Sequence, residues 1–78
     1  MIVTSTSPLS FTLHLTDGRT IRTFGEAVAF VGSLSAEERS RTHWELSHRM
    51  LQRCLESPDF LHAATISLRS ALLMDGLS

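Results

Sequence analysis

An alternation of apolar and polar residues over positions 9–16 constrains the fold of this chain more than any other feature. Apolar side chains occupy the odd positions and polar side chains the even positions. A period of two is typical of a strand with one buried face. Asp17 and Gly18 then provide a turn, and a second β-favouring run follows over 20–23. Residues 9–24 are therefore predicted to form an antiparallel β-hairpin.

The position of Ile21 determines the register of this hairpin. A two-residue loop would place Ile21 opposite His14 on the polar face. A three-residue loop over 16–18, with Gly18 as the bulge glycine, places Ile21 opposite Leu13. The second register keeps the apolar side chains on one face, so it is the one we expect.

Helical patterns follow the hairpin. Thr23 and Glu26 have the spacing of a capping box, so the second strand should lead directly into a first helix. The residues expected on the apolar face of this helix are Ala27, Phe30, Val31 and Leu34.

The start of the second helix is left open by two competing capping boxes. Ser35 with Glu38 would begin it early, and Thr42 with Glu45 would begin it seven residues later. We expect a polar, partly helical connector up to Arg41, and then a firm helix from about residue 43 to residue 56. The predicted buried stripe consists of Trp44, Ser47, Leu51, Cys54 and Leu55, widened by Leu46 and Met50.

The last helix has clear boundaries. Ser57, Pro58 and Asp59 read as an N-cap, a first-turn proline and an early acid, and Gly76 reads as the end. Its core stripe is expected to be Leu61, Ala64, Leu68, Ala71 and Leu72. A second apolar series, formed by Ala63, Ile66, Ser70, Leu73 and Leu77, runs along much of the opposite side.

Length and composition indicate one small α+β domain. The chain has 78 residues and a net charge of −1. We expect a flexible N-terminus over 1–8 and a domain over 9–78 in which the hairpin precedes three helices (ββααα). A single cysteine excludes an intrachain disulfide and suits a reducing cytoplasm. No signal peptide is apparent, and no apolar run approaches the roughly 20 residues that span a bilayer.

Several residues match the pattern of a known family. Thr23 with Glu26-Ala27 fits its first helix, Cys54 fits a cysteine near the end of its second, and Ala64, Ala71, Gly76 and Leu77 fit its closing helix. Over about residues 9–77 the chain resembles the small bacterial proteins of the domain of unknown function 982 family. Thr65 and Leu68 stand where that family has Arg and Phe, and its Trp-Pro motif is missing. The resemblance implies the ββααα architecture and no activity.

Cys54 is the first candidate for chemistry because Arg49 and Arg53 lie close to it in the sequence. A thiol beside positive charge can become a nucleophile. These three side chains are therefore the candidate reactive or ligand-binding groups. Cys54 also lies on the predicted apolar stripe, where a cysteine packs as a small hydrophobe. A structural role for Cys54 is the favoured interpretation.

Other chemistry is weakly supported. His43 and His48 are five residues apart, out of phase for one helix face, and no metal or cofactor site is predicted. Trp44 could stack on a nucleic-acid base. However, Glu45 stands four residues before Arg49, the order that favours an ion pair within a helix, so a solvated face is favoured over a nucleic-acid interface.

The second apolar series of the last helix points to self-association. One helix in a domain this small seldom buries two faces, so Ile66, Leu73 and Leu77 form a candidate interface. The free edge of the hairpin is another possible docking surface. We expect a non-enzymatic interaction or regulatory module that forms a homodimer. The alternatives are a small-molecule binder or thiol-dependent enzyme built around Cys54 and, third, a weak nucleic-acid binder.

Overall fold

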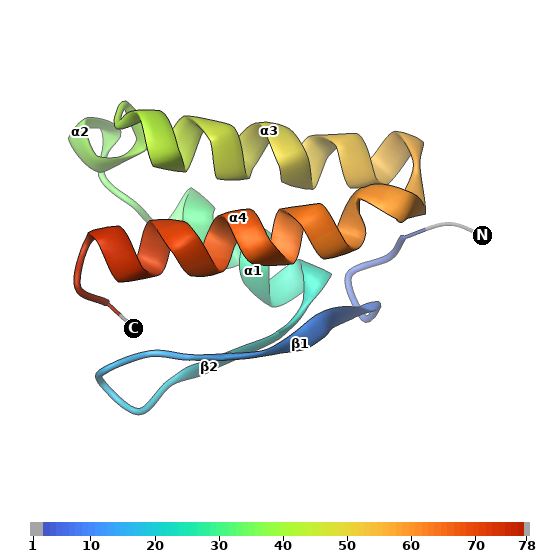
Figure 1. Ribbon diagram of the computed structural model, residues 1–78, viewed down its shortest axis with the longest axis horizontal. Coiled ribbons are helices and arrows are strands. Elements are labelled where there is room, and N and C mark those ends of the chain that lie inside the picture. Colours follow the sequence, from blue (N-terminus) through green and yellow to red (C-terminus); the bar gives the residue numbers. More distant parts are fainter. Residues whose placement is uncertain (1–2, 78) are drawn as a thin grey trace.

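The computed structural model describes residues 3–77 as a two-stranded hairpin with helices packed on one side (Figure 1). The strands are β1 (Pro8–His14) and β2 (Thr20–Thr23). The helices are α1 (Phe24–Gly32), α2 (Ala36–Arg39), α3 (Thr42–Glu56) and α4 (Leu61–Met74), with a short 3₁₀ helix, η1 (Pro58–Phe60), before α4. The α+β class and the order of hairpin then helices are confirmed.

The helices form two layers over the hairpin. Helix α4 contacts β1 and α1 contacts β2, whereas α3 packs against α4 and α1 (Figure 1). Two helices therefore cover the hairpin directly, and the third covers those two. In this arrangement α3 and α4 lie side by side and leave one face of the pair uncovered by the rest of the chain.

The hairpin has the predicted register. Leu13 lies opposite Ile21, and the Leu15 amide donates to the Arg19 carbonyl at 2.9 Å, which leaves residues 16–18 as the loop. Gly18 has a φ of +93°, in the region that favours glycine. The odd-numbered side chains of β1 face the core, as the alternation indicated.

Helix α1 begins with the predicted capping box. The Thr23 hydroxyl accepts from the Glu26 amide at 3.2 Å, and the Glu26 carboxylate accepts from the Thr23 amide. The preceding segment, expected to be flexible over 1–8, is described from residue 3. There the carbonyls of Ser5 and Ser7 accept from the first amides of α1 at 2.9 and 2.8 Å. Residues 1 and 2 lie outside the described part of the chain.

The two possible starts of the second helix each lie at the beginning of a separate helix, but only the first forms its capping box. Ser35 and Glu38 form a reciprocal capping box and begin the single turn of α2. Helix α3 begins at Thr42 with Arg41 as its N-cap and no side-chain capping bond. The Thr42–Glu45 box does not form because Thr42 is already the first helical residue, so its hydroxyl is no longer at the capping position.

The stripe predicted for α3 is confirmed at its centre and in part at Met50, which packs partly buried against the core, and it is wrong at Leu46 and Leu55. Trp44, Ser47, Leu51 and Cys54 are buried. Leu55, expected in the core, is 62% exposed, and Leu46, expected to widen the stripe, is 49% exposed. Leu55 lies beside Val28 of α1, which is also exposed, and Leu46 faces away from α1 along the outer side of the α3 and α4 pair. Each lies where no further layer covers the helix.

Helix α4 starts later than predicted and ends where predicted. Residues 58–60 form η1, and Ser57 makes no side-chain capping bond. At the other end Gly76 has a φ of +70°. The Leu77 amide donates to the Leu72 carbonyl at 2.8 Å, and the Gly76 amide donates to the Leu73 carbonyl at 3.2 Å. These two bonds form a Schellman motif. No helix within residues 3–77 has the length and apolar character needed to cross a membrane.

Candidate functional site

The uncovered side of α3 and α4 carries an apolar groove of about 550 Å³. Its walls come from both helices, and its most exposed large side chains are Leu46 (49%), Ile66 (41%) and Met74 (69%). We call it the α3–α4 face and define it by Leu46, Met50, Ala63, Ile66, Ser67, Ser70 and Met74, with His43 at one end. Contiguous exposed apolar side chains of this kind mark interaction sites in small domains.

The candidate interface predicted on the last helix overlaps this face only in part. Ile66 lines the groove, and Leu73 is exposed on the same side of α4 without lining it. Leu77 is half-buried against the core. Its carbonyl accepts from the Thr16 amide at 2.8 Å, so Leu77 also connects the end of the helix to the hairpin loop. The part of the face that the sequence did not indicate is the contribution of α3, whose Leu46 was assigned to the core.

An Asp75-centred cluster closes one end of the α3–α4 face. The indole nitrogen of Trp44 donates to Asp75 Oδ2 at 2.6 Å, and His43 Nε2 lies 2.9 Å from Asp75 Oδ1. Arg41 completes the cluster with Nη1 3.0 Å from Oδ2. One carboxylate at the end of α4 therefore binds three side chains at the start of α3, which fixes the two helices relative to each other.

These contacts stabilise the charged form of Asp75. The pKa of its carboxyl group is lowered mainly by the hydrogen bond from the Trp44 indole and further by the His43 and Arg41 contacts, against an opposing effect of partial desolvation. The Asp75 side chain is mostly buried, so these three donors take the place of water molecules as hydrogen-bond partners of its carboxylate. The cluster is a structural anchor beside the groove.

The Asp75 cluster was not predicted, although the sequence contains a signal for it. Asp75 is the C-cap residue of α4, where the negative end of the helix dipole disfavours a carboxylate, and the last turn of α4 has no basic residue to offset it. An acid at such a position indicates a specific partner elsewhere in the chain. The sequence does not show that this partner is the first turn of α3.

The structure favours a packing role for Cys54. Its side chain is fully buried, and its thiol lies 3.4 Å from the Met50 carbonyl. Burial raises the pKa of the Cys54 thiol, which disfavours the thiolate that a nucleophile requires. The guanidinium of Arg53 lies over the Phe60 ring, with its central carbon 5.6 Å from the ring centroid. Of the three groups of the thiol hypothesis, Arg49 lines a cavity beside α3 that neither Cys54 nor Arg53 lines.

Trp44 is unavailable for stacking on a nucleic-acid base. It is fully buried, and its ring packs against Phe30 at a centroid distance of 5.8 Å. Among the described residues no three His, Cys, Asp or Glu side chains lie close enough together to hold a metal ion.

The edges of the hairpin are partly satisfied within the chain. The Ser10 amide donates to Thr65 Oγ1 at 3.3 Å, and the Thr16 amide donates to Leu77. On the other strand the Arg22 amide donates to the Glu26 carboxylate at 2.9 Å. Each of these amides lies outside the ladder between the two strands. They are therefore not free to pair with a strand from another molecule.

The fold and this face define the class of the molecule as a small α+β domain with an uncovered apolar helical surface. No family model, curated protein or solved structure matches the chain. The resemblance to the domain of unknown function 982 family stays a prediction.

Proposed function

We propose that this protein is a small, non-enzymatic interaction module of the cytoplasm that forms a homodimer through its α3–α4 face. The observation that carries the proposal is the continuous apolar groove to which both helices contribute Leu46, Met50, Ile66 and Met74. A cytoplasmic location agrees with the single, unpaired cysteine.

A second copy of the chain is the occupant that the charges favour. In a two-fold dimer the same surface lies on both sides of the interface, so any charged group on it meets its own kind. The residues that line the α3–α4 face include no Asp, Glu, Arg or Lys. The face can therefore meet its own copy without like-charge repulsion, and it offers no charge pattern that would select a different partner.

The alternative dimer, through the edge of the hairpin, has less support. Pairing of edge strands requires free backbone amides and carbonyls. The amides of Ser10 and Arg22 already donate to side chains of α4 and α1. The short β2 strand of four residues offers little additional edge.

Light scattering after size-exclusion chromatography tests the proposal. We expect a mass of twice the 8.7 kDa chain at high micromolar concentration. Ile66→Glu and Leu46→Glu each place a charge in the apolar contact, and we expect each to shift the protein to a monomer because an unpaired charge is poorly tolerated there. Far-UV circular dichroism of the variants confirms that the fold is retained.

Leu55→Glu is the matched control. It makes the same change at a leucine of α3 that is somewhat more exposed than Leu46 (62% against 49%), in the other apolar patch beside Val28. We expect this variant to remain a dimer. A monomeric wild type at high micromolar concentration would exclude the proposal, and dissociation by Leu55→Glu alone would move the interface to the patch around Val28.

A further inference from the structure

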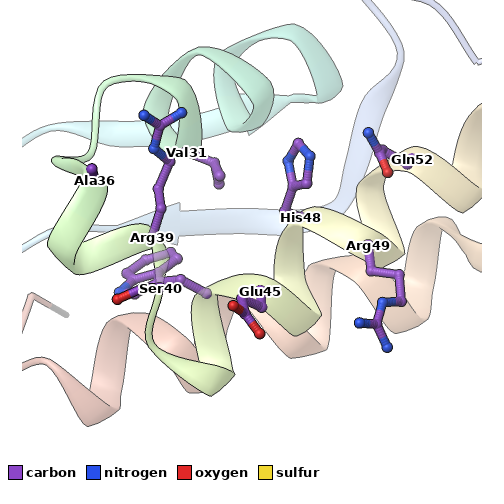
Figure 2. Close-up of a pocket in the computed structure, with 9 residues that line it drawn as sticks. Val31, Ala36, Arg39, Ser40, Glu45, His48, Arg49 and Gln52 are labelled. Carbon is purple, nitrogen blue, oxygen red and sulfur yellow. The ribbon is translucent and has the colours of Figure 1, made fainter.

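A second cavity lies on the side of α3 that faces α1 and α2 (Figure 2). It has a volume of about 580 Å³, within the range of small-molecule sites. The buried side chains of Val31 and Trp44 close its base, and Ala36 adds to the apolar wall. This cavity shares no residue with the groove of the α3–α4 face.

The rim of this cavity carries uncompensated positive charge. Arg39 and Arg49 line it with a single acid, Glu45, so the fixed charges sum to +1. The expected ion pair between Glu45 and Arg49 is not formed, and within residues 3–77 neither arginine has an acidic partner within 4.0 Å. Unpaired guanidinium groups at a cavity are typical of sites that receive an anion.

Three polar side chains, one from α2 and two from α3, point into the space between α3 and α1. Figure 2 shows Arg39, His48 and Gln52 directed toward α1, while Arg49 and Glu45, which line the same cavity, point away from α1 in this view. Arg39 comes from α2, and the other two come from successive turns of α3. The single turn of α2 thus adds a guanidinium to a cavity that α3 lines with an imidazole and an amide, and all three groups can donate hydrogen bonds.

We propose that this cavity binds a small organic carboxylate with an apolar body. Arg39 would hold the carboxylate, with His48 and Gln52 as additional donors, and Arg49 would contribute positive potential at the other side. The mostly apolar wall, including the aliphatic stems of the arginines, would contact the body of the ligand. This site is independent of the dimer interface and does not use Cys54.

The test uses three probes that share one ring system: indole-3-acetate, its neutral amide and tryptamine. They are titrated into ¹⁵N-labelled protein and followed by two-dimensional NMR. Val31, Ala36 and Arg39 line this cavity and not the α3–α4 face, so their amide signals report on it. The indole N–H of Trp44 donates to Asp75 beside the α3–α4 face and is therefore not used as the reporter. We expect saturable shifts of the amides of Val31, Ala36 and Arg39 with indole-3-acetate, and much weaker shifts with the amide and the amine.

Variants locate the anion contact. Arg39→Gln should weaken indole-3-acetate binding by roughly tenfold because a charge-assisted hydrogen bond is lost. Arg53→Gln removes the same charge from an arginine of α3 that does not line the cavity, and it should leave the affinity unchanged. The NMR spectrum of each free variant shows whether its fold is intact.

Three results would overturn the proposal. The first is the absence of saturable shifts with indole-3-acetate. The second is equal binding of the acetate and the neutral amide. The third is a set of shifts confined to Ile66, Met74 and their neighbours, which would place the probe in the α3–α4 face instead.

Discussion

A carboxylate at the C-terminal end of a helix is unfavourable unless other groups offset the dipole, and at Asp75 three side chains do so. Trp44, Arg41 and His43 all belong to the beginning of α3, 31 to 34 residues earlier in the chain. Only the folded chain brings these donors to the carboxylate. The charge on Asp75 is therefore linked to folding.

This linkage predicts a loss of stability in acid. The folded state lowers the pKa of Asp75 below the ordinary value of 3.8, so its contribution is complete above that pH and disappears as the pH falls through the lower, folded-state pKa. Asp75→Asn should lower the free energy of unfolding at neutral pH and flatten its dependence on pH below about 4. Urea unfolding followed by tryptophan fluorescence at a series of pH values measures both effects.

Asp59→Asn is the charge-matched control for that experiment. Asp59 is exposed and has no ion-pair partner within residues 3–77. Its removal should leave the acid dependence in place. If Asp75→Asn retained the wild-type curve, the Asp75 cluster would not be the source of the acid sensitivity.

Two glycines of α1 should respond oppositely to alanine. A Cβ atom on Gly25 would lie 2.7 Å from the Ser5 carbonyl oxygen and 2.8 Å from Ser5 Cβ, so the N-terminal segment would have to move. Gly32 has nothing within 4 Å of the same position. Gly25→Ala should lower the free energy of unfolding by about 1–3 kcal/mol. Gly32→Ala should raise it by about 0.5 kcal/mol because alanine favours the helix.

Equilibrium urea unfolding of both variants gives the comparison. A stabilising effect of Gly25→Ala would show that the segment around Ser5 does not depend on close approach to α1. A destabilising effect of Gly32→Ala would show an unrecognised contact at the end of α1.

At the level of elements, Thr65 connects α4 to the hairpin. Its side chain is fully buried. The hydroxyl donates to the Leu61 carbonyl at 2.8 Å and accepts from the Ser10 amide at 3.3 Å. In the pattern of the domain of unknown function 982 family, whose match to this chain stays a prediction, this position is an arginine. Here the position faces the core against β1, which leaves no exposed place for a guanidinium.

Thr65→Val tests this connection because it keeps the shape and removes the hydroxyl. The Ser10 amide would lose its acceptor, and we expect the free energy of unfolding to fall by about 1–2 kcal/mol. Thr12→Val makes the same change at an exposed position of β1 and should alter it by less than about 0.5 kcal/mol. Equal effects of the two substitutions in urea unfolding would contradict the role of Thr65.

At the level of the whole molecule, the parts that the sequence predicted are those whose determinants are local. The hairpin register depends on the alternation over 9–16 and on Gly18, and the start of α1 depends on Thr23 and Glu26. These residues are close in sequence, so their pattern could be interpreted without knowing the packing of the helices.

The parts that were missed depend on how separate elements meet. Leu46 and Leu55 belong to an apolar series, but only the positions of α1 and α4 decide that both stay exposed. The sequence therefore indicated only the α4 side of the α3–α4 face, through Ala63, Ile66 and Ser70. The cavity beside Arg39 requires α1, α2 and α3 together, and no single segment contains its pattern.

The hydrogen bonds from the hairpin to Thr65 of α4 and to Leu77 just after α4 have a consequence for biosynthesis. The amides of Ser10 and Thr16 find their acceptors on Thr65 and Leu77, which are 55 and 61 residues further along the chain. The hairpin leaves the ribosome before α4, so during translation its apolar face is incompletely covered and these amides lack their acceptors until the last helix and Leu77 are made. Until α4 emerges, the nascent chain presents an incomplete strand edge, the state in which small β segments are most prone to aggregate.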